Sequence, residues 1–205
     1  MNGTSQPSRR RSWLLLLGGG VWALAVFAGM AILWEYSITP GASAAPPRLW
    51  PEGSRMERDP GIPTLVMLAH PRCPCTRASI EELARVMARC PGRVRAYVLM
   101  LRPAGLPEDW ATTDLWRSAA IIPGVTVLRD DDGAEARLFH AATSGQTLLY
   151  DAAGRLRFSG GITDARGHAG DNAGADAVVS FLTRGTAARP ETSVFGCSLV
   201  GPGSS

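Results

Sequence analysis

The sequence predicts an α/β domain, in which a central mixed β-sheet is flanked by helices, together with one N-terminal transmembrane helix. Three observations lead to this fold class. An uncharged apolar segment lies near the N-terminus, short apolar runs alternate with helical patterns further along, and a hairpin pattern follows them. The chain has 205 residues, enough for one domain with a substantial core in addition to the apolar segment.

The apolar segment covers residues 13–34 and contains no charged side chain. As a helix rising about 1.5 Å per residue it would reach about 30 Å, the thickness of the hydrocarbon core of a bilayer. Arg9, Arg10 and Arg11 precede it, and positively charged flanks stay on the cytoplasmic side. We therefore expect residues 1–12 in the cytoplasm, a single-pass helix in the inner (cytoplasmic) membrane, and the remainder facing the periplasm.

A cleaved signal peptide is the alternative for this segment. Ala42, Ser43 and Ala44 form a triplet of the kind at which such peptides are cut. The apolar run is longer than the usual signal-peptide core of about 7–15 residues, and the triplet lies well beyond its end, so we favour an uncleaved anchor. Both interpretations export the domain.

Composition divides the exported part into three regions. Residues 35–60 are rich in Pro, Gly, Ala and Ser and are predicted to form a linker. Residues 61–185 carry the periodic patterns of a folded domain. Residues 186–205 are rich in Gly, Ser and Pro, and we predict a flexible tail that carries Cys197.

The first half of the domain alternates strands and helices. Residues 62–69 are a short apolar run that predicts a buried strand. A helix follows from about residue 75 to residue 90, with apolar residues on one face and Pro-Gly at its end. Residues 94–101 predict a second strand, and residues 107–120 a second helix with proline in its first turn.

The second half begins with a strand and turn over residues 124–133 and a short helix over residues 134–142. Residues 148–158 have the pattern of a hairpin, and residues 174–185 that of a closing helix stopped by glycine. Alternating units predict parallel strands with helices on both faces, and the hairpin adds an antiparallel edge.

Charge and motifs exclude several functions. Lys and Arg number 21 against 18 Asp and Glu, a formal net charge of +3, and part of the excess is the N-terminal arginine run. No basic stripe with interleaved aromatic residues is present, so we do not expect nucleic acid binding. The sequence also has no glycine-rich phosphate loop and no Ser-His-Asp pattern.

The chemistry of the domain is predicted at a C-P-C motif, where Cys73 and Cys75 flank Pro74 at the junction of the first strand and helix. Thiol–disulfide exchange requires a thiolate near neutral pH. The positive end of a helix favours the thiolate, and Arg72 and Arg77 add positive charge nearby. We therefore expect at least one of the two cysteines to be reactive.

The sequence predicts the roles of the other two cysteines, Cys90 and Cys197, less directly. A disulfide between Cys73 and Cys75 requires a tight turn and would be strained and easily reduced. A single attacking thiol that is resolved by Cys197 is the other version of the mechanism, although an exposed or structurally bridged Cys197 is the interpretation we favour. Cys90 lies on the apolar face of its helix and is predicted to be a core residue.

This order of elements, with cysteines after the first strand, resembles the thioredoxin-fold redoxins of the ResA and TlpA type. The similarity extends over residues 61–185. The closer resemblance is to the small membrane-anchored RedB-like proteins, and it rests on the stretches HPRCPCTRAS and TSGQTLLYDAAGRLRFSGGITDARGHAGDNAG.

Two departures from the thioredoxin pattern are evident. If Cys75 stands at the second cysteine of the usual C-x-x-C motif, Arg72 occupies the first. The resemblance also implies a cis-proline before the strand that faces the active site, and the matching place is residues 143–145, which contain no proline.

The resemblance implies a thiol–disulfide oxidoreductase that acts on protein thiol or disulfide partners without an organic cofactor. Cys73 and Cys75 are the predicted catalytic residues. The residues predicted to support them lie around the motif, on the facing edge and in a later loop: His70, Arg72, Pro74, Arg77, Thr143, Ser144, Gly145 and His168.

Two alternatives remain open. A Cu(I)-binding assembly factor, as in the anchored Sco-type proteins, would use Cys73 and Cys75 with His70 or His168, although their C-x-x-x-C motif is absent. A non-catalytic binding module with the same fold is the third. For the loop after the hairpin, either Arg166 and His168 line the C-P-C groove, or the polar side chains satisfy backbone groups of the loop and cap the final helix. The polar residues of this second interpretation are Asp164, Arg166, Asp171 and Asn172.

Overall fold

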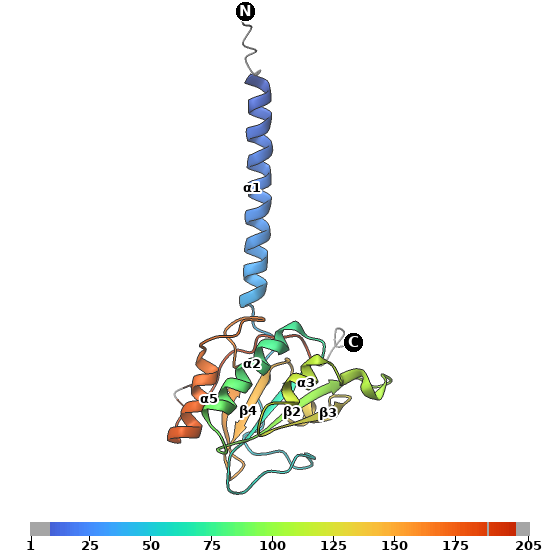
Figure 1. The fold of residues 1–205 in the computed structure, drawn as a ribbon, viewed down its shortest axis with the longest axis vertical. Coiled ribbons are helices and arrows are strands. Elements are labelled where there is room, and N and C mark those ends of the chain that lie inside the picture. Colours follow the sequence, from blue (N-terminus) through green and yellow to red (C-terminus); the bar gives the residue numbers. More distant parts are fainter. Residues whose placement is uncertain (1–8, 188, 200–205) are drawn as a thin grey trace, which may run out of the picture. The chain divides into compact units, whose positions relative to one another are not determined.

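The computed structural model describes residues 9–187 and 189–199, so most of the predicted cytoplasmic segment, residues 1–12, lies outside the described part. The chain divides into two compact units after Ser37. The first contains α1, Arg9–Ile38, whose stretch Ser12–Ile38 has a mean hydropathy of 2.1 (Figure 1). Length and composition suit a membrane span, and a signal sequence would have the same properties.

The second unit contains a five-stranded sheet in the order β3-β2-β1-β4-β5. Strands β1 (Thr64–Ala69), β2 (Arg95–Arg102) and β3 (Val125–Asp131) are parallel. The hairpin strands β4 (Gln146–Tyr150) and β5 (Leu156–Gly160) run antiparallel to β1 and to each other. The predicted mixed sheet with an antiparallel edge is confirmed, and it is the thioredoxin-like arrangement.

Helices cover the sheet as the alternating pattern predicts. One face is covered by α2 (Pro74–Arg89), α3 (Asp114–Ala120) and α5 (Ala173–Arg184), as Figure 1 shows. The short helix α4 (Ala134–Leu138) packs on the opposite face. Each face therefore has its own apolar core, with the buried strands shared between them.

The helix predicted over residues 107–120 is broken in two. A 3₁₀ helix, Glu108–Ala111, is followed by two threonines, and α3 begins only at Asp114. Thr113 has an extended backbone, with φ −89° and ψ −175°, and its hydroxyl donates to the carbonyl of Pro71 at 3.0 Å. This hydrogen bond connects the start of α3 to the loop before α2. A continuous helix over residues 107–120 would prevent the bond.

The segment predicted as a linker packs against the domain through its backbone. Trp50 donates its N–H to the carbonyl of Gly154 at 2.8 Å, and Leu156 of β5 donates to the carbonyl of Arg48 at 2.8 Å. The hydroxyl of Tyr150 donates to the carbonyl of Pro47 at 3.0 Å. Composition predicted a tether here, but these residues extend the structure beyond β5.

The tail predicted to be flexible also packs against the domain in its described part, residues 189–199. Gly41 donates its N–H to the carbonyl of Val194 at 2.8 Å, and Leu199 donates to the carbonyl of Ala142 at 2.8 Å. Val194 and Leu199 are both buried. Backbone bonds and two apolar anchors thus hold a segment whose composition suggested disorder.

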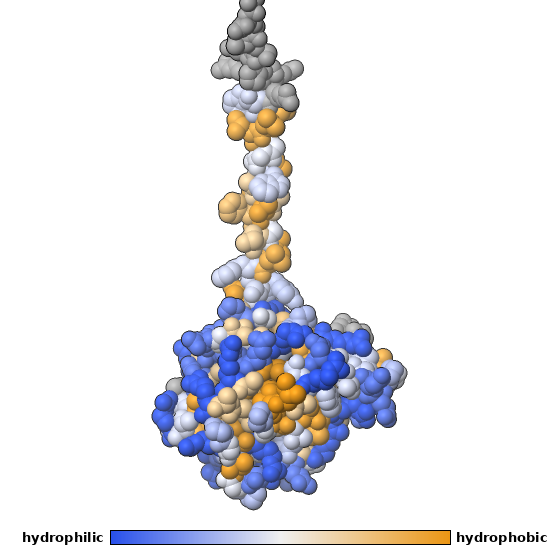
Figure 2. Space-filling model, in the orientation of Figure 1, coloured by the Kyte–Doolittle hydropathy of each residue, from blue (hydrophilic) through white to orange (hydrophobic). Residues whose placement is uncertain are grey.

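An apolar groove opens on the helical face of the domain, and Figure 2 shows an apolar area on this side. It has a volume of about 610 Å³ and lies between the C-terminal parts of α2 and α3. Its most exposed large side chain is Ile121, 81% exposed. The groove is therefore distinct from the N-terminus of α2, where the C-P-C motif lies. The apolar residues that line it are Ile80, Ala84, Met87, Ile121, Ile122 and Pro123.

Replacing Leu149 by Ala should lower the free energy of unfolding by about 2–5 kcal/mol, because this β4 side chain is fully buried in the sheet. The matched variant Leu49→Ala removes a side chain that is 63% exposed and should change it by less than about 0.5 kcal/mol. Denaturant unfolding in mild detergent, followed by tryptophan fluorescence, measures both. Equal losses in the two variants would contradict this packing.

Candidate active site

The site begins where β1 gives way to α2. Cys73 is the N-cap residue of α2, and Pro74 follows at the first helical position. Proline suits this position because its φ is already near the helical value and it has no N–H to leave unsatisfied. The carbonyl of Cys73 accepts the N–H of Thr76 at 3.0 Å. The Cys73 thiol therefore lies at the positive end of α2, where backbone N–H groups have no partner within the helix.

Three sulfur atoms meet at this helix end. The Sγ atoms of Cys73, Cys75 and Cys197 all lie within 4.8 Å of one another. Cys73 and Cys75 are buried and Cys197 is half-buried, and all three are free thiols. Cys90 is fully buried in the helical-face core, which confirms the structural position predicted for it.

The C-terminal segment brings Cys197 to the site by a close backbone approach. The N–H of Ser144 donates to the carbonyl of Cys197 at 2.8 Å, and Thr143 pairs with Ser198 in an isolated antiparallel bridge. A Cβ at Gly196 would lie 1.9 Å from the carbonyl oxygen of Ser144. Only glycine therefore permits the segment to approach this closely.

The facing edge predicted at residues 143–145 lies against the start of α2. The hydroxyls of Ser144 and Thr76 are 2.8 Å apart, and the Ser144 hydroxyl also accepts the N–H of His70 at 2.8 Å. Gly145 has a φ of +90°, and its N–H donates to the carbonyl of Leu68 at 2.8 Å. Hydroxyl groups thus link the facing edge to the start of α2. The described residues contain no cis peptide bond, so this edge lacks the cis-proline of the thioredoxin pattern.

Arg166 is the cation at the sulfur cluster. Its guanidinium donates to the carbonyl of Gly196 and also has a hydrogen-bonding interaction with the Cys75 thiol. It therefore bridges the C-terminal segment and the C-P-C motif. Arg166 therefore lines the groove, as one interpretation of its loop predicts, whereas Asn172 of the same loop caps α5, as the other predicts.

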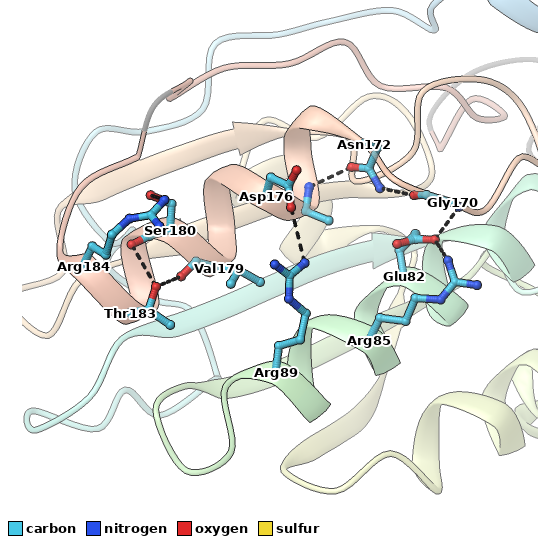
Figure 3. A network of polar contacts seen from close by, with 11 residues as sticks. Glu82, Arg85, Arg89, Gly170, Asn172, Asp176, Val179, Ser180, Thr183 and Arg184 are labelled. Atoms are coloured by element: carbon cyan, nitrogen blue, oxygen red, sulfur yellow. Dashed lines mark hydrogen bonds and ion pairs between the residues drawn. The ribbon is translucent and has the colours of Figure 1, made fainter.

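A polar network anchors the loop that carries Arg166 (Figure 3). Glu82, a buried residue of α2, accepts the backbone N–H of Gly170 at 2.7 Å and pairs with Arg85. Asn172 caps α5 by accepting the N–H of Ala175 at 2.7 Å. The far end of the loop is thereby tied to the helix that also presents Cys73 and Cys75.

The three thiols differ in their electrostatic surroundings. Burial opposes ionisation of Cys73, but hydrogen-bonding interactions with Cys197 and with backbone groups of Thr76 and Cys75 outweigh it and lower its pKa. Burial and the neighbouring Cys73 raise the pKa of Cys75, and Arg166 opposes this rise. Burial, together with Cys73, raises the pKa of Cys197 to about 12. Of the three thiols, Cys73 is therefore the one whose surroundings most favour the thiolate.

The arginines expected to support the thiolate have other partners. The Arg72 guanidinium lies 4.7 Å from the centroid of the Trp110 ring, and Arg77 pairs with Asp114. The His70 ring also packs edge-on against Trp110, and its Nδ1 accepts the N–H of Arg72 at 3.2 Å. These contacts order the turn before α2.

His168, predicted to approach the cysteines, is exposed and is not part of the sulfur cluster. Sequence reasoning gave Cys197 a place at the site only as the less favoured version, and left the role of Arg166 open. The local signal for Cys197 was the Gly-Cys pair in the tail, and the local signal for Arg166 was an arginine in a polar loop.

Comparisons with known proteins agree at the level of the fold. No family model matches the chain, and no curated protein matches it. An uncharacterized conserved protein from Geobacillus kaustophilus is 20% identical over 80% of this chain and 93% of its own, with a TM-score of 0.56. A hypothetical protein from Sinorhizobium meliloti 1021 is 24% identical over 79% of this chain and 94% of its own, with a TM-score of 0.54.

A secreted Mycobacterium tuberculosis disulfide oxidoreductase, homologous to E. coli DsbE, is 22% identical over 47% of this chain and 66% of its own. Its TM-score is 0.39, and this overlap is too partial to bear on function. The structures from Geobacillus kaustophilus and Sinorhizobium meliloti therefore share the fold of this chain, and membership of the RedB-like proteins stays a prediction.

The lowered pKa of Cys73 predicts that this thiol ionises at a lower pH than an ordinary cysteine does. A titration followed by the ultraviolet absorbance of thiolates should show one such group in the wild-type chain and none in Cys73→Ser. Cys90→Ser serves as the control and should keep it. Cys197→Ala should shift this titration to higher pH, because the interaction with Cys197 favours the charged form. A profile unchanged in Cys73→Ser would contradict the assignment.

Proposed function

We propose that this protein is a membrane-anchored, extracytoplasmic thiol–disulfide oxidoreductase that acts on protein partners, with Cys73 as its nucleophile. The observation that carries the proposal is a thiolate-favouring cysteine at a helix N-terminus with two further thiols beside it. Thiol–disulfide exchange needs a nucleophilic thiolate and a second thiol within reach. The mixed sheet provides a rigid support for both.

The chemistry proceeds in two exchange steps. The Cys73 thiolate attacks one sulfur of a partner disulfide, so that a mixed disulfide forms and the other partner sulfur leaves as a thiolate. A neighbouring thiol then attacks the Cys73 sulfur. Its bond to Cys73 forms, the bond to the partner breaks, and its proton passes to the leaving sulfur. The partner gains two electrons, and the reverse sequence oxidises a partner dithiol.

The proposed location follows from α1 and from the chemistry. A single apolar helix preceded by arginines would anchor the chain in the inner membrane and place the domain in the periplasm. Disulfides persist in that compartment, whereas cytosolic thiols are kept reduced. A cleaved signal sequence would export the same domain without the anchor, and the exchange chemistry would be unchanged.

Trapping of a mixed disulfide tests the exchange function. In the variant Cys75→Ser/Cys197→Ser, Cys73 keeps its helix N-terminus but has no neighbouring thiol to resolve a mixed disulfide. Incubation with oxidised glutathione should therefore leave one glutathione on Cys73, detected by peptide mass spectrometry.

The same variant with Cys73→Ser added is the control, and it should lose this adduct while buried Cys90 stays unmodified. Absence of the adduct on Cys73 at every glutathione concentration tested would contradict the exchange function.

Cu(I) binding is the second candidate, because three thiolates that converge within 4.8 Å suit a soft metal ion of low coordination number. The ligand set would be Cys73, Cys75 and Cys197, in place of the histidine expected from the sequence. Binding would require loss of the thiol protons, so the ion would compete with protons for the site.

Reduced protein titrated with Cu(I) against a chromophoric chelator measures this candidate. One equivalent should bind to the wild-type chain and to His168→Ala, and Cys73→Ser/Cys75→Ser should lose it. Stoichiometric binding that survives loss of both cysteines, or that requires His168, would contradict this ligand set.

A further inference from the structure

The C-terminal segment holds Cys197 between two attachments to the domain. Before the cysteine, the carbonyl of Ser193 accepts the N–H of Gly161 at 3.2 Å and Val194 is buried. After it, Leu199 is 3% exposed and packs in the core on the face opposite α2. Cys197 is thus placed at the cluster by a segment that pairs with β5 only through an isolated bridge, between Glu191 and Ser159, and belongs to no helix or strand of its own.

Burial distinguishes the two sulfurs at the N-terminus of α2. Cys73 is 2% exposed, and Cys197 beside it is half-buried. The side chain and backbone of Cys197 both interact with Cys73. Cys197 is therefore the more accessible of the two residues, and the C-terminal segment must shift before Cys73 can attack a partner disulfide.

Geometry disfavours Cys75 as the disulfide partner of Cys73. Cys73 is the N-cap residue, with an extended backbone, and Cys75 is the second residue of α2, so their sulfurs are close but are both held by the first turn of the helix. A disulfide needs sulfurs about 2.05 Å apart with a defined dihedral angle, so its formation would unwind the first turn, where Pro74 fixes φ. Cys197 comes from a separate segment, which can shift toward Cys73 without disturbing α2.

We propose that Cys197 is a further catalytic residue, the thiol that resolves mixed disulfides at Cys73, and that the resulting Cys73–Cys197 disulfide locks the C-terminal segment over the site. This inference rests on the proposed exchange function. Cys197 attacks the Cys73 sulfur of the mixed disulfide, the Cys73–Cys197 bond forms and the bond to the partner sulfur breaks. The proton of Cys197 passes to the departing partner thiolate, so that the partner is reduced and the cysteine pair oxidised by two electrons.

In the oxidised pair, one of the two sulfurs is the expected target of an incoming thiolate. An incoming protein thiolate reaches the half-buried sulfur of Cys197 first, and Cys73 then departs as a thiolate at the positive end of α2. Exchange is faster when the leaving thiol has the lower pKa. A second thiolate of the same partner attacks the partner sulfur bound to Cys197, a disulfide forms in the partner, and Cys197 leaves and takes up a proton.

The test maps disulfides in the full-length chain in detergent, equilibrated in buffers of reduced and oxidised glutathione, quenched by alkylation and digested. A peptide that links Cys73 to Cys197 should form in the wild-type chain and in Cys75→Ser. In Cys197→Ser the linked peptide should be absent and glutathione should accumulate on Cys73. Cys90→Ser is the matched control and should behave as the wild type does.

Two results would contradict the inference, and they differ in whether the proposed exchange function also fails. A Cys73–Cys75 disulfide that forms equally in the wild type and in Cys197→Ser would overturn the role of Cys197 and leave the exchange function standing. Absence of any disulfide or adduct at Cys73 in all variants would overturn the exchange function itself, and this inference with it.

Gly196→Ala tests the segment without removing a sulfur. Its Cβ would meet the carbonyl oxygen of Ser144 at 1.9 Å, so the segment must move away while all four thiols remain. The linked peptide should be lost, or should form only in more oxidising buffer. Ser193→Ala, an exposed change earlier in the same segment that keeps the backbone bond to Gly161, should have no effect. Undiminished linkage in Gly196→Ala would overturn the role of the docked segment.

Discussion

The sulfur of Cys73 lies at the N-terminus of α2, where interactions with backbone groups of Thr76 and Cys75 favour its thiolate, and the rest of the site depends on this arrangement. A thiolate buried away from water needs such groups, because burial alone would raise its pKa. The helix supplies them without side-chain entropy, since the backbone is already ordered by packing on the sheet. Thr76 and the hydroxyl of Ser144 then connect this helix end to the facing edge. The same constraint favours the negative charge on Cys73 over the adjacent thiols, whose pKa values are raised.

Two segments far from the motif complete the site. The loop after β5 is tied to α2 by Glu82 and Gly170, and it places Arg166 between Cys75 and the carbonyl of Gly196. A cation in this position stabilises negative charge on the sulfur cluster whichever thiol carries it. The C-terminal segment contributes the third sulfur. Exchange and Cu(I) binding draw on these same properties, because both need thiolates, and they differ in whether the sulfurs bond to one another or to a metal ion.

Local patterns predicted the fold well where side chains repeat with a helical or strand period. Every strand appears in its expected place and order, and α2 begins at Pro74 as its apolar face and proline indicate. Composition predicted a linker and a flexible tail in two segments that are held in place by backbone contacts. The segment before β1 and the C-terminal segment have no period to detect, yet they are held by hydrogen bonds to Gly154 and Ser144. The break before α3 also came from a tertiary contact, between Thr113 and Pro71.

The sequence by itself determined the apolar N-terminal helix, the mixed sheet and the position of Cys73 and Cys75 at a helix N-terminus, because each of these follows from residues close together in the chain. Only the tertiary structure decided which groups surround the two thiols. Cys197 and Arg166 reach them from separate loops, and the missing Cβ of Gly196 is what lets the C-terminal segment approach Ser144. Such contacts between distant segments depend on how the helices, strands and loops pack together, and residue spacing within one segment does not predict them.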